Sequence, residues 1–166
     1  FVPKKYTVKT VSGNPSWGST TPTSGTYDYL SDVTLTAHSN TGYDFAGWND
    51  GNTDNPRTYN VKAVEPDITF TASFKPHEYK VITGTNDPLM GNMTPQTGTY
   101  RYDSLLTLTA TAQPGYRFKE WSDHGSPSSP REYRVAAVDD TIIKAVFEPD
   151  EFRVRVQSED LNKGKV

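Results

Sequence analysis

Cysteine is absent from the 166-residue chain, which excludes disulfide bonds, zinc–thiolate sites and cysteine nucleophiles. A run of about 18 apolar residues is also absent, so no segment has the composition of a membrane-spanning helix. The opening residues, FVPKKYTV, lack the basic start, apolar stretch and cleavage site of a signal peptide. We therefore expect any signal or anchor to lie outside these residues.

Neither positive nor negative charge predominates in the chain, and histidine is scarce. The formal net charge is -3, with both signs interspersed, and no basic patch of the kind used for nucleic-acid binding is visible. The three histidines, His38, His77 and His124, are not repeated and show no metal-binding spacing. Phosphate-binding glycine loops and the GxSxG elbow are missing as well. The sequence therefore predicts no enzyme activity, metal, cofactor or nucleic-acid partner in this chain.

Two aromatic stretches show that the chain repeats itself. GYDFAGWND begins at Gly42 and GYRFKEWSD begins at Gly115, 73 positions later. After Trp121 the second copy gains one residue near His124 and loses one near Asp139. A fixed period of this size is the signature of a tandem array. Further pairs at the offset of 73 are Tyr6 and Tyr79, Gly18 and Gly91, Pro22 and Pro95, Tyr27 and Tyr100, Leu35 and Leu108, and Phe74 and Phe147.

The two ends of the chain match the interior of the repeat. FVP at 1–3 corresponds to FKP at 74–76, and EFRVRV at 151–156 corresponds to EYKVIT at 78–83. We therefore expect a fragment cut from a longer array. The predicted division is the end of a preceding repeat at 1–3, repeat 1 at 4–76, repeat 2 at 77–149, and the start of a third repeat at 150–166.

Alternation of apolar and polar residues predicts strands in each copy. In the first copy, Val33, Leu35 and Ala37 share one face of a strand, and the alternate residues of 68–74 are expected to point inward. Further strands are predicted at 6–11, 42–48 and 57–64, while GSTTPTSGTY at 18–27 has the composition of a turn-rich connection. About five strands in each copy, without a long amphipathic stretch, predict an all-β fold of two small tandem modules.

The repeated aromatic stretch is predicted to form the core of each module. A module of about 73 residues buries only about 60% of its unfolded surface, so it depends on large aromatic side chains. The alternative is that part of the set, above all the tyrosine, forms an exposed platform for a ligand. The predicted core residues are Tyr43, Phe45, Trp48, Tyr116, Phe118 and Trp121.

Two further features leave ligand binding open. Trp17 lies beside a glycine in a turn region, and Met90 occupies its position in the second copy. It either stacks on a sugar or a partner, or it covers the core. The tyrosine pairs Tyr27 with Tyr29 and Tyr100 with Tyr102 share one face of an extended segment, where they form either a stacking strip or ordinary cross-strand packing.

The oxygen-rich stretch NDGNTDN at 49–55 raises the question of calcium. It lacks the regular spacing and the terminal glutamate of an EF-hand loop, and the second copy carries SDHGSPSSP in its place. A turn accounts for both versions.

The whole pattern resembles a known family. A Tyr-x-Val start, a Gly-x-Tyr about 20 residues later, VTLTA, GYxFxxW and a closing ITFTASF strand are similar to the divergent internalin B-type repeat, also called the Listeria–Bacteroides repeat. The resemblance covers both copies and the two ends. It implies extracellular modules of bacterial surface proteins and a small β-grasp-like fold, with no catalytic motif to carry over.

Three functions are compatible with these observations. The first is a non-catalytic stalk or spacer of a cell-surface or secreted protein, whose partners are neighbouring repeats of the same chain. The second is an adhesion or glycan-binding module that recognises a host glycan or matrix protein. The third is an accessory part of a secreted enzyme whose catalytic domain lies elsewhere.

Overall fold

The computed structural model describes residues 4–62 and 67–154, and within these ranges every regular element is a β-strand. No helix in the described residues is long and apolar enough to cross a membrane. The structure confirms the predicted all-β class. A β-grasp fold in the strict sense contains a helix packed on its sheet, and the described ranges contain none.

Each repeat contributes seven strands, two more than the sequence predicts. The first repeat contains β1 (Lys5–Ser12), β2 (Gly18–Thr21), β3 (Ser24–Asp28), β4 (Asp32–Ser39), β5 (Tyr43–Trp48), β6 (Arg57–Asn60) and β7 (Asp67–Pro76). The second contains β8 (Glu78–Thr85), β9 (Gly91–Thr94), β10 (Gly98–Arg101), β11 (Leu105–Ala112), β12 (Tyr116–Trp121), β13 (Arg131–Arg134) and β14 (Thr141–Pro149).

The two additional strands of the first repeat, β2 and β3, come from the stretch predicted to be a connection. Both are short, rich in serine and threonine, and lie at the edge of a sheet. Threonine favours strands because its branched side chain fits a pleated surface. Pro22 lies between the two strands, where its missing N–H disturbs no ladder. The turn-forming residues therefore mark the passage from one sheet to the other.

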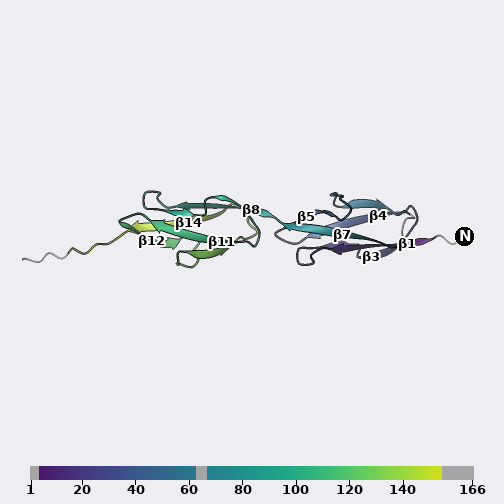
Figure 1. Cartoon of the computed structure of the whole chain (residues 1–166), viewed down its shortest axis with the longest axis horizontal. Helices are drawn as coiled ribbons and strands as arrows, with labels where there is room; N and C mark the ends of the chain where they lie inside the picture. The colour runs from purple at the N-terminus through teal and green to yellow at the C-terminus, as the bar shows by residue number, and fades with distance from the viewer. Residues whose placement is uncertain (1–3, 63–66, 155–166) are drawn as a thin grey trace, which may run out of the picture. The chain divides into compact units, whose positions relative to one another are not determined.

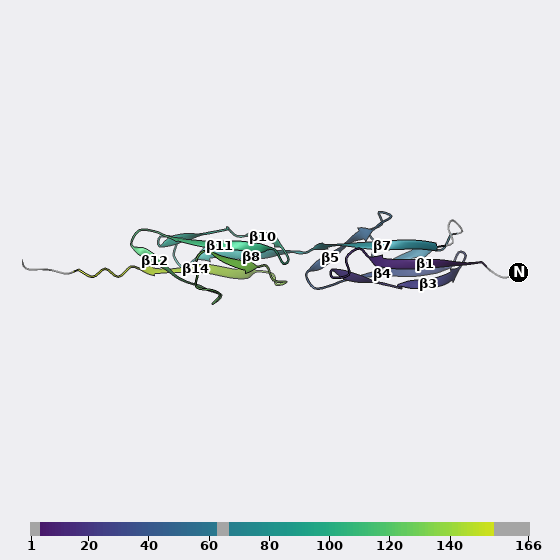
Figure 2. The same ribbon diagram turned by 60° about the horizontal axis from the view of Figure 1, so that its bottom comes forward.

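Each repeat folds into a four-stranded and a three-stranded sheet. The first repeat has the orders β3-β1-β7-β5 and β2-β4-β6, and the second has the corresponding orders β10-β8-β14-β12 and β13-β11-β9. In the first repeat β1 and β7 lie side by side and run parallel, from the pair Thr7–Asp67 to the pair Ser12–Ala72 (Figure 1, Figure 2). The first and last strands of the repeat thus form the centre of its larger sheet.

The core of the first repeat lies between its two sheets. Val33, Leu35 and Ala37 are buried, as the alternation in β4 predicts. In β7, Phe70, Ala72 and Phe74 are buried and Ile68 packs against them half-buried. Of the six aromatic residues predicted for the core, Trp48 and Trp121 are 4% and 0% exposed, whereas Tyr43, Phe45, Tyr116 and Phe118 are half-buried.

The described residues divide into two compact units, and the division runs through the second repeat. One unit contains residues 83–96, 107–131 and the segment from Ile142 onward, and the other contains the rest. The first repeat therefore shares its unit with residues 77–82, 97–106 and 132–141. The predicted end of a preceding repeat at 1–3 and most of the predicted third repeat, 155–166, lie outside the described residues.

Candidate functional site

Trp17, the first predicted ligand-binding residue, is half-buried in the turn immediately before β2. Its ring stacks on Tyr43 with centroids 5.2 Å apart and planes inclined by 15°, and it packs against the core of the first repeat. The indole N–H groups of Trp48 and Trp121 donate to the carbonyls of Asp54 and Ser128 at 3.0 and 2.9 Å. Within the described residues Trp17 has no such acceptor, so its polar edge remains available.

Tyr27 and Tyr29, the first predicted tyrosine pair, differ in burial. Tyr27 packs against the core, whereas Tyr29 is 53% exposed and contacts the Tyr6 ring at 6.4 Å. In the second repeat Tyr100 is half-buried, opposite Tyr79 in the ladder. Tyr102 contacts Tyr43 and Tyr79, with centroid distances of 5.4 and 6.2 Å. Tyr27 and Tyr29 therefore lie in different surroundings, one against the core and the other at the surface.

The oxygen-rich stretch at 49–55 folds as a hydrogen-bonded turn. Asp50 Oδ1 accepts from the N–H of Asn52, and Asn52 Oδ1 accepts from the N–H of Asp54. Arg57 donates to both carboxylate oxygens of Asp50, at 2.7 and 2.8 Å, and its guanidinium lies 4.9 Å from the Phe70 ring centre. The described residues contain no group of three histidine, cysteine or acidic side chains placed to hold a metal ion. The side-chain oxygens of Asp50 and Asn52 thus accept hydrogen bonds from the turn's own backbone.

The Asp50–Arg57 contact predicts an acid-sensitive stability. Burial raises the pKa of Asp50, but hydrogen bonds from Arg57 and the Asn52 backbone and the charge of Arg57 outweigh it, so the pKa lies below 3.8. A carboxyl whose pKa is lower in the folded than in the unfolded state stabilises the fold above the unfolded pKa. That contribution is lost as the pH falls through the folded pKa. We expect the urea midpoint of the first repeat to fall below about pH 4.

Asp50→Asn is the variant for this measurement. It should lower the urea midpoint at pH 7 and flatten its dependence on pH between about 2 and 4. The effect is modest because the Asp50 side chain is 39% exposed and solvent screens the pair. An unchanged pH profile in the variant would contradict the assignment.

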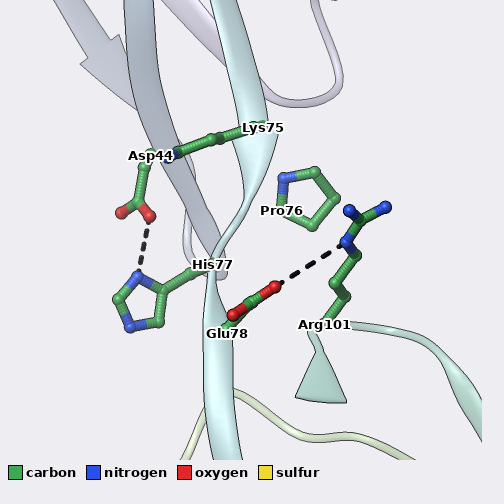
Figure 3. Close-up of a pocket in the computed structure, with 6 residues that line it drawn as sticks. All are labelled: Asp44, Lys75, Pro76, His77, Glu78 and Arg101. Carbon is green, nitrogen blue, oxygen red and sulfur yellow. Dashed lines mark hydrogen bonds and ion pairs between the residues drawn. The ribbon is translucent and has the colours of Figure 1, made fainter. Parts of the chain in front are cut away.

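The segment where β7 passes into β8 forms a polar hollow of about 470 Å³ lined by Asp44, Lys75, Pro76, His77, Glu78 and Arg101 (Figure 3). All six residues belong to one compact unit. His77 Nδ1 lies 2.8 Å from Asp44 Oδ2, and Arg101 Nε lies 3.9 Å from Glu78 Oε1. Figure 3 shows the side chains of these two pairs directed toward each other. The arrangement contains no activated nucleophile, and its charges are largely matched internally.

Backbone hydrogen bonds hold His77, the single residue between the two strands. Its N–H donates to the Gly42 carbonyl at 2.9 Å, and its carbonyl accepts from the N–H of Tyr102 at 2.8 Å. At the end of the second repeat, the N–H of Asp150 donates to the Gly115 carbonyl at 2.9 Å, which repeats the first of these bonds. The connection is therefore fixed through its backbone, a feature that the sequence does not reveal.

Asparagine side chains provide a second feature that sequence reasoning missed. Asn55 Oδ1 accepts from the N–H of Ala37 at 2.8 Å, and its Nδ2 donates to the carbonyl of the same residue at 2.7 Å. Asn86 binds Phe147 in the same way, at 2.9 Å for both bonds. We call this two-bond arrangement a carboxamide clamp. The only signal in the sequence is an asparagine in a turn-rich stretch, which by itself indicates a turn.

A family comparison agrees with the repeated structure. The model of the divergent InlB B-repeat domain matches residues 6–78 and again residues 82–151. Comparisons with curated proteins and with solved structures give no match. Each matched range contains one copy of the aromatic stretch, and together the ranges cover most of the sequence. The chain therefore belongs to the divergent InlB B-repeat family and carries two of its repeats in tandem.

Proposed function

We propose that this chain is a non-catalytic spacer within a bacterial cell-surface or secreted protein, and that neighbouring repeats of the same chain are its main partners. The family supports a place among surface proteins, for which such tandem repeats are typical. A spacer must keep its length under thermal motion, and the connection between its repeats decides whether it does.

The observation that carries this proposal is the bonding of His77. A one-residue linker allows little freedom by its length alone. Here its N–H and its carbonyl are both bonded, to Gly42 and Tyr102, and the His77 side chain contacts Asp44. In addition, the compact unit of the first repeat includes residues 77–82 of the second. These contacts favour a connection that resists bending.

A distance measurement by pulsed electron paramagnetic resonance tests the proposal. The chain has no cysteine, so labels attach only to introduced ones. Thr26→Cys and Thr99→Cys place them at exposed, equivalent positions in β3 and β10. We expect a single distance distribution as narrow as that of a pair within the first repeat, Thr26→Cys with Thr58→Cys.

A flexible variant provides the control. Insertion of Gly-Ser-Gly after His77 should broaden the distribution between the repeats and leave the distribution within the first repeat unchanged. If the original chain gives a distribution as broad as that of the insertion variant, the repeats move independently and the spacer proposal fails.

Adhesion is the second candidate function, and one observation favours it. Trp17 combines a half-buried ring with an indole N–H that has no acceptor among residues 4–62 and 67–154, in a position where the second repeat has a methionine. A residue that the fold requires should recur in both repeats, so a tryptophan found in only one of them fits a role in recognition better than a role in packing. The residues beside this ring, which include Asn14 and Phe74, determine which ligand it recognises.

A further inference from the structure

The second repeat closes an edge that the first repeat leaves open. Asn86 follows β8 directly, and its carboxamide clamps the N–H and the carbonyl of Phe147 in β14. The equivalent residue in the first repeat is Gly13, which has no side chain, and the equivalent of Phe147 is Phe74. No side chain in the described residues contacts the Phe74 backbone groups as Asn86 contacts those of Phe147.

The geometry of β7 shows where these backbone groups point. The Ala72 carbonyl accepts from the N–H of Gly13 at 2.8 Å, on the side of β1, whereas the Thr71 carbonyl accepts from Asn49 at 2.9 Å, on the side of β5. Alternate residues of a strand direct their N–H and carbonyl groups to opposite edges. Phe74, two residues after Ala72, therefore directs both groups toward the β1 side, beyond the end of β1 at Ser12.

A hollow lies at this open edge. Its volume is about 300 Å³, and its lining residues are Gly13, Asn14, Trp17, Ser73 and Phe74. None of them carries a charge, so the hollow suits a neutral ligand. The half-buried ring of Trp17 forms one wall and provides an apolar surface for the carbon atoms next to a polar group.

We propose that this hollow binds the side-chain carboxamide of an asparagine or glutamine presented by a partner protein. The carboxamide donates to the Phe74 carbonyl and accepts from the Phe74 N–H, as Asn86 does with Phe147. Trp17 packs against the methylene groups of the same side chain. The two clamps within this chain show that a primary carboxamide fits such a pair of backbone groups. The site is independent of the spacer function.

Other occupants match the edge less well. An added β-strand needs several pairs of backbone donors and acceptors along the edge. The Ala72 carbonyl already accepts from the N–H of Gly13, and Pro76 has no N–H. Between Ala72 and Pro76, Phe74 is therefore the one residue that offers both groups on this side of β7. A carboxylate cannot donate to the Phe74 carbonyl. The N-acetyl group of an amino sugar has its N–H and carbonyl on opposite sides of a trans amide, so it reaches only one of the two groups.

Nuclear magnetic resonance titration of the full chain tests the proposal. The probe is the capped tripeptide acetyl-Gly-Gln-Gly-N-methylamide, and the matched control carries glutamate in place of glutamine. We expect saturable shifts of the Phe74 amide and the Trp17 indole resonances with the glutamine probe only, and an unchanged Phe147 amide. No saturable shift, or equal shifts with both peptides, would overturn the proposal. N-acetylglucosamine is the third probe, and a Phe74 response to it alone would assign the hollow to amino sugars instead.

Gly13→Asn supplies a variant that fills the hollow from within. Its backbone has an ordinary conformation, and the new Cβ would approach the Ala72 carbonyl oxygen at 3.2 Å, which requires a small local shift. We expect the variant to weaken glutamine-probe binding by about tenfold or more and to slow hydrogen exchange of the Phe74 amide. A folded variant with slowed exchange that still binds the probe at the original affinity would show that the clamp is not the site.

Discussion

Trp121→Ala should destabilise the second repeat by about 3–5 kcal/mol, the range for removing a large aromatic side chain from a core. Trp121 is 0% exposed, its ring lies 5.0 Å from that of Phe118, and its indole N–H donates to the Ser128 carbonyl. The substitution leaves a cavity and also removes the surface on which the Arg131 guanidinium rests, 5.2 Å from the ring centre. For a module of this size the loss is comparable to the whole free energy of unfolding.

Urea unfolding followed by far-ultraviolet circular dichroism measures this loss. We expect the variant to unfold in two steps, with the second repeat first, because the substitution lowers the stability of that repeat alone. Trp17→Ala is the control. The Trp17 ring is half-buried and donates to no carbonyl in the part of the chain that the structure describes, so a loss of about 1–2 kcal/mol is expected. If both variants lose the same free energy of unfolding, the complete burial of Trp121 adds nothing to the stability of its repeat.

Gly42→Ala should lower the free energy of unfolding of the compact unit that contains His77 by about 2–5 kcal/mol. Gly42 has φ of +85°, a conformation that costs an alanine about 1–2 kcal/mol. A Cβ at this position would also overlap the ring of Tyr102 near its attachment to the chain. Relief of that overlap requires a displaced ring or backbone, and overpacking of this kind costs about 1–3 kcal/mol.

Gly115→Ala is the matched control, since it shares the conformation but not the neighbour. Its φ is +87°, and a Cβ there would meet nothing within 4 Å. The difference between the two variants in the free energy of unfolding therefore measures the contact with Tyr102 alone. If both lose the same amount, the close approach of Gly42 to Tyr102 does not contribute to stability.

The strands that sequence reasoning predicted are those whose pattern is local. In β4 and β7, apolar residues alternate over several positions, and alternation depends only on the geometry of a single strand. Val33, Leu35 and Phe70 were therefore placed correctly. β2 and β3 were missed because their serine and threonine side chains show no apolar alternation and become strands only through pairing with β4 and β1.

The sites depend on pairings that no local pattern contains. Asn86 and Gly13 are equivalent by position, yet their difference matters only because β7 and β14 pass beside them, about sixty residues later in the chain. Likewise, the exposed fraction of Tyr29 and the half-buried position of Tyr102 follow from different neighbours, although both belong to the same repeated tyrosine pair. The period of 73 residues predicts equivalence of position and not equivalence of environment.

The parallel pairing of β1 and β7 determines how a repeat responds to mechanical force. These are the first and last strands of the repeat, and they lie side by side. Tension applied through the chain pulls the start of β1 and the end of β7 in opposite directions along their common axis. All hydrogen bonds between them are then loaded together in shear and cannot open one after another. A repeat built in this way resists stretching most strongly along the direction in which its own chain transmits the pull.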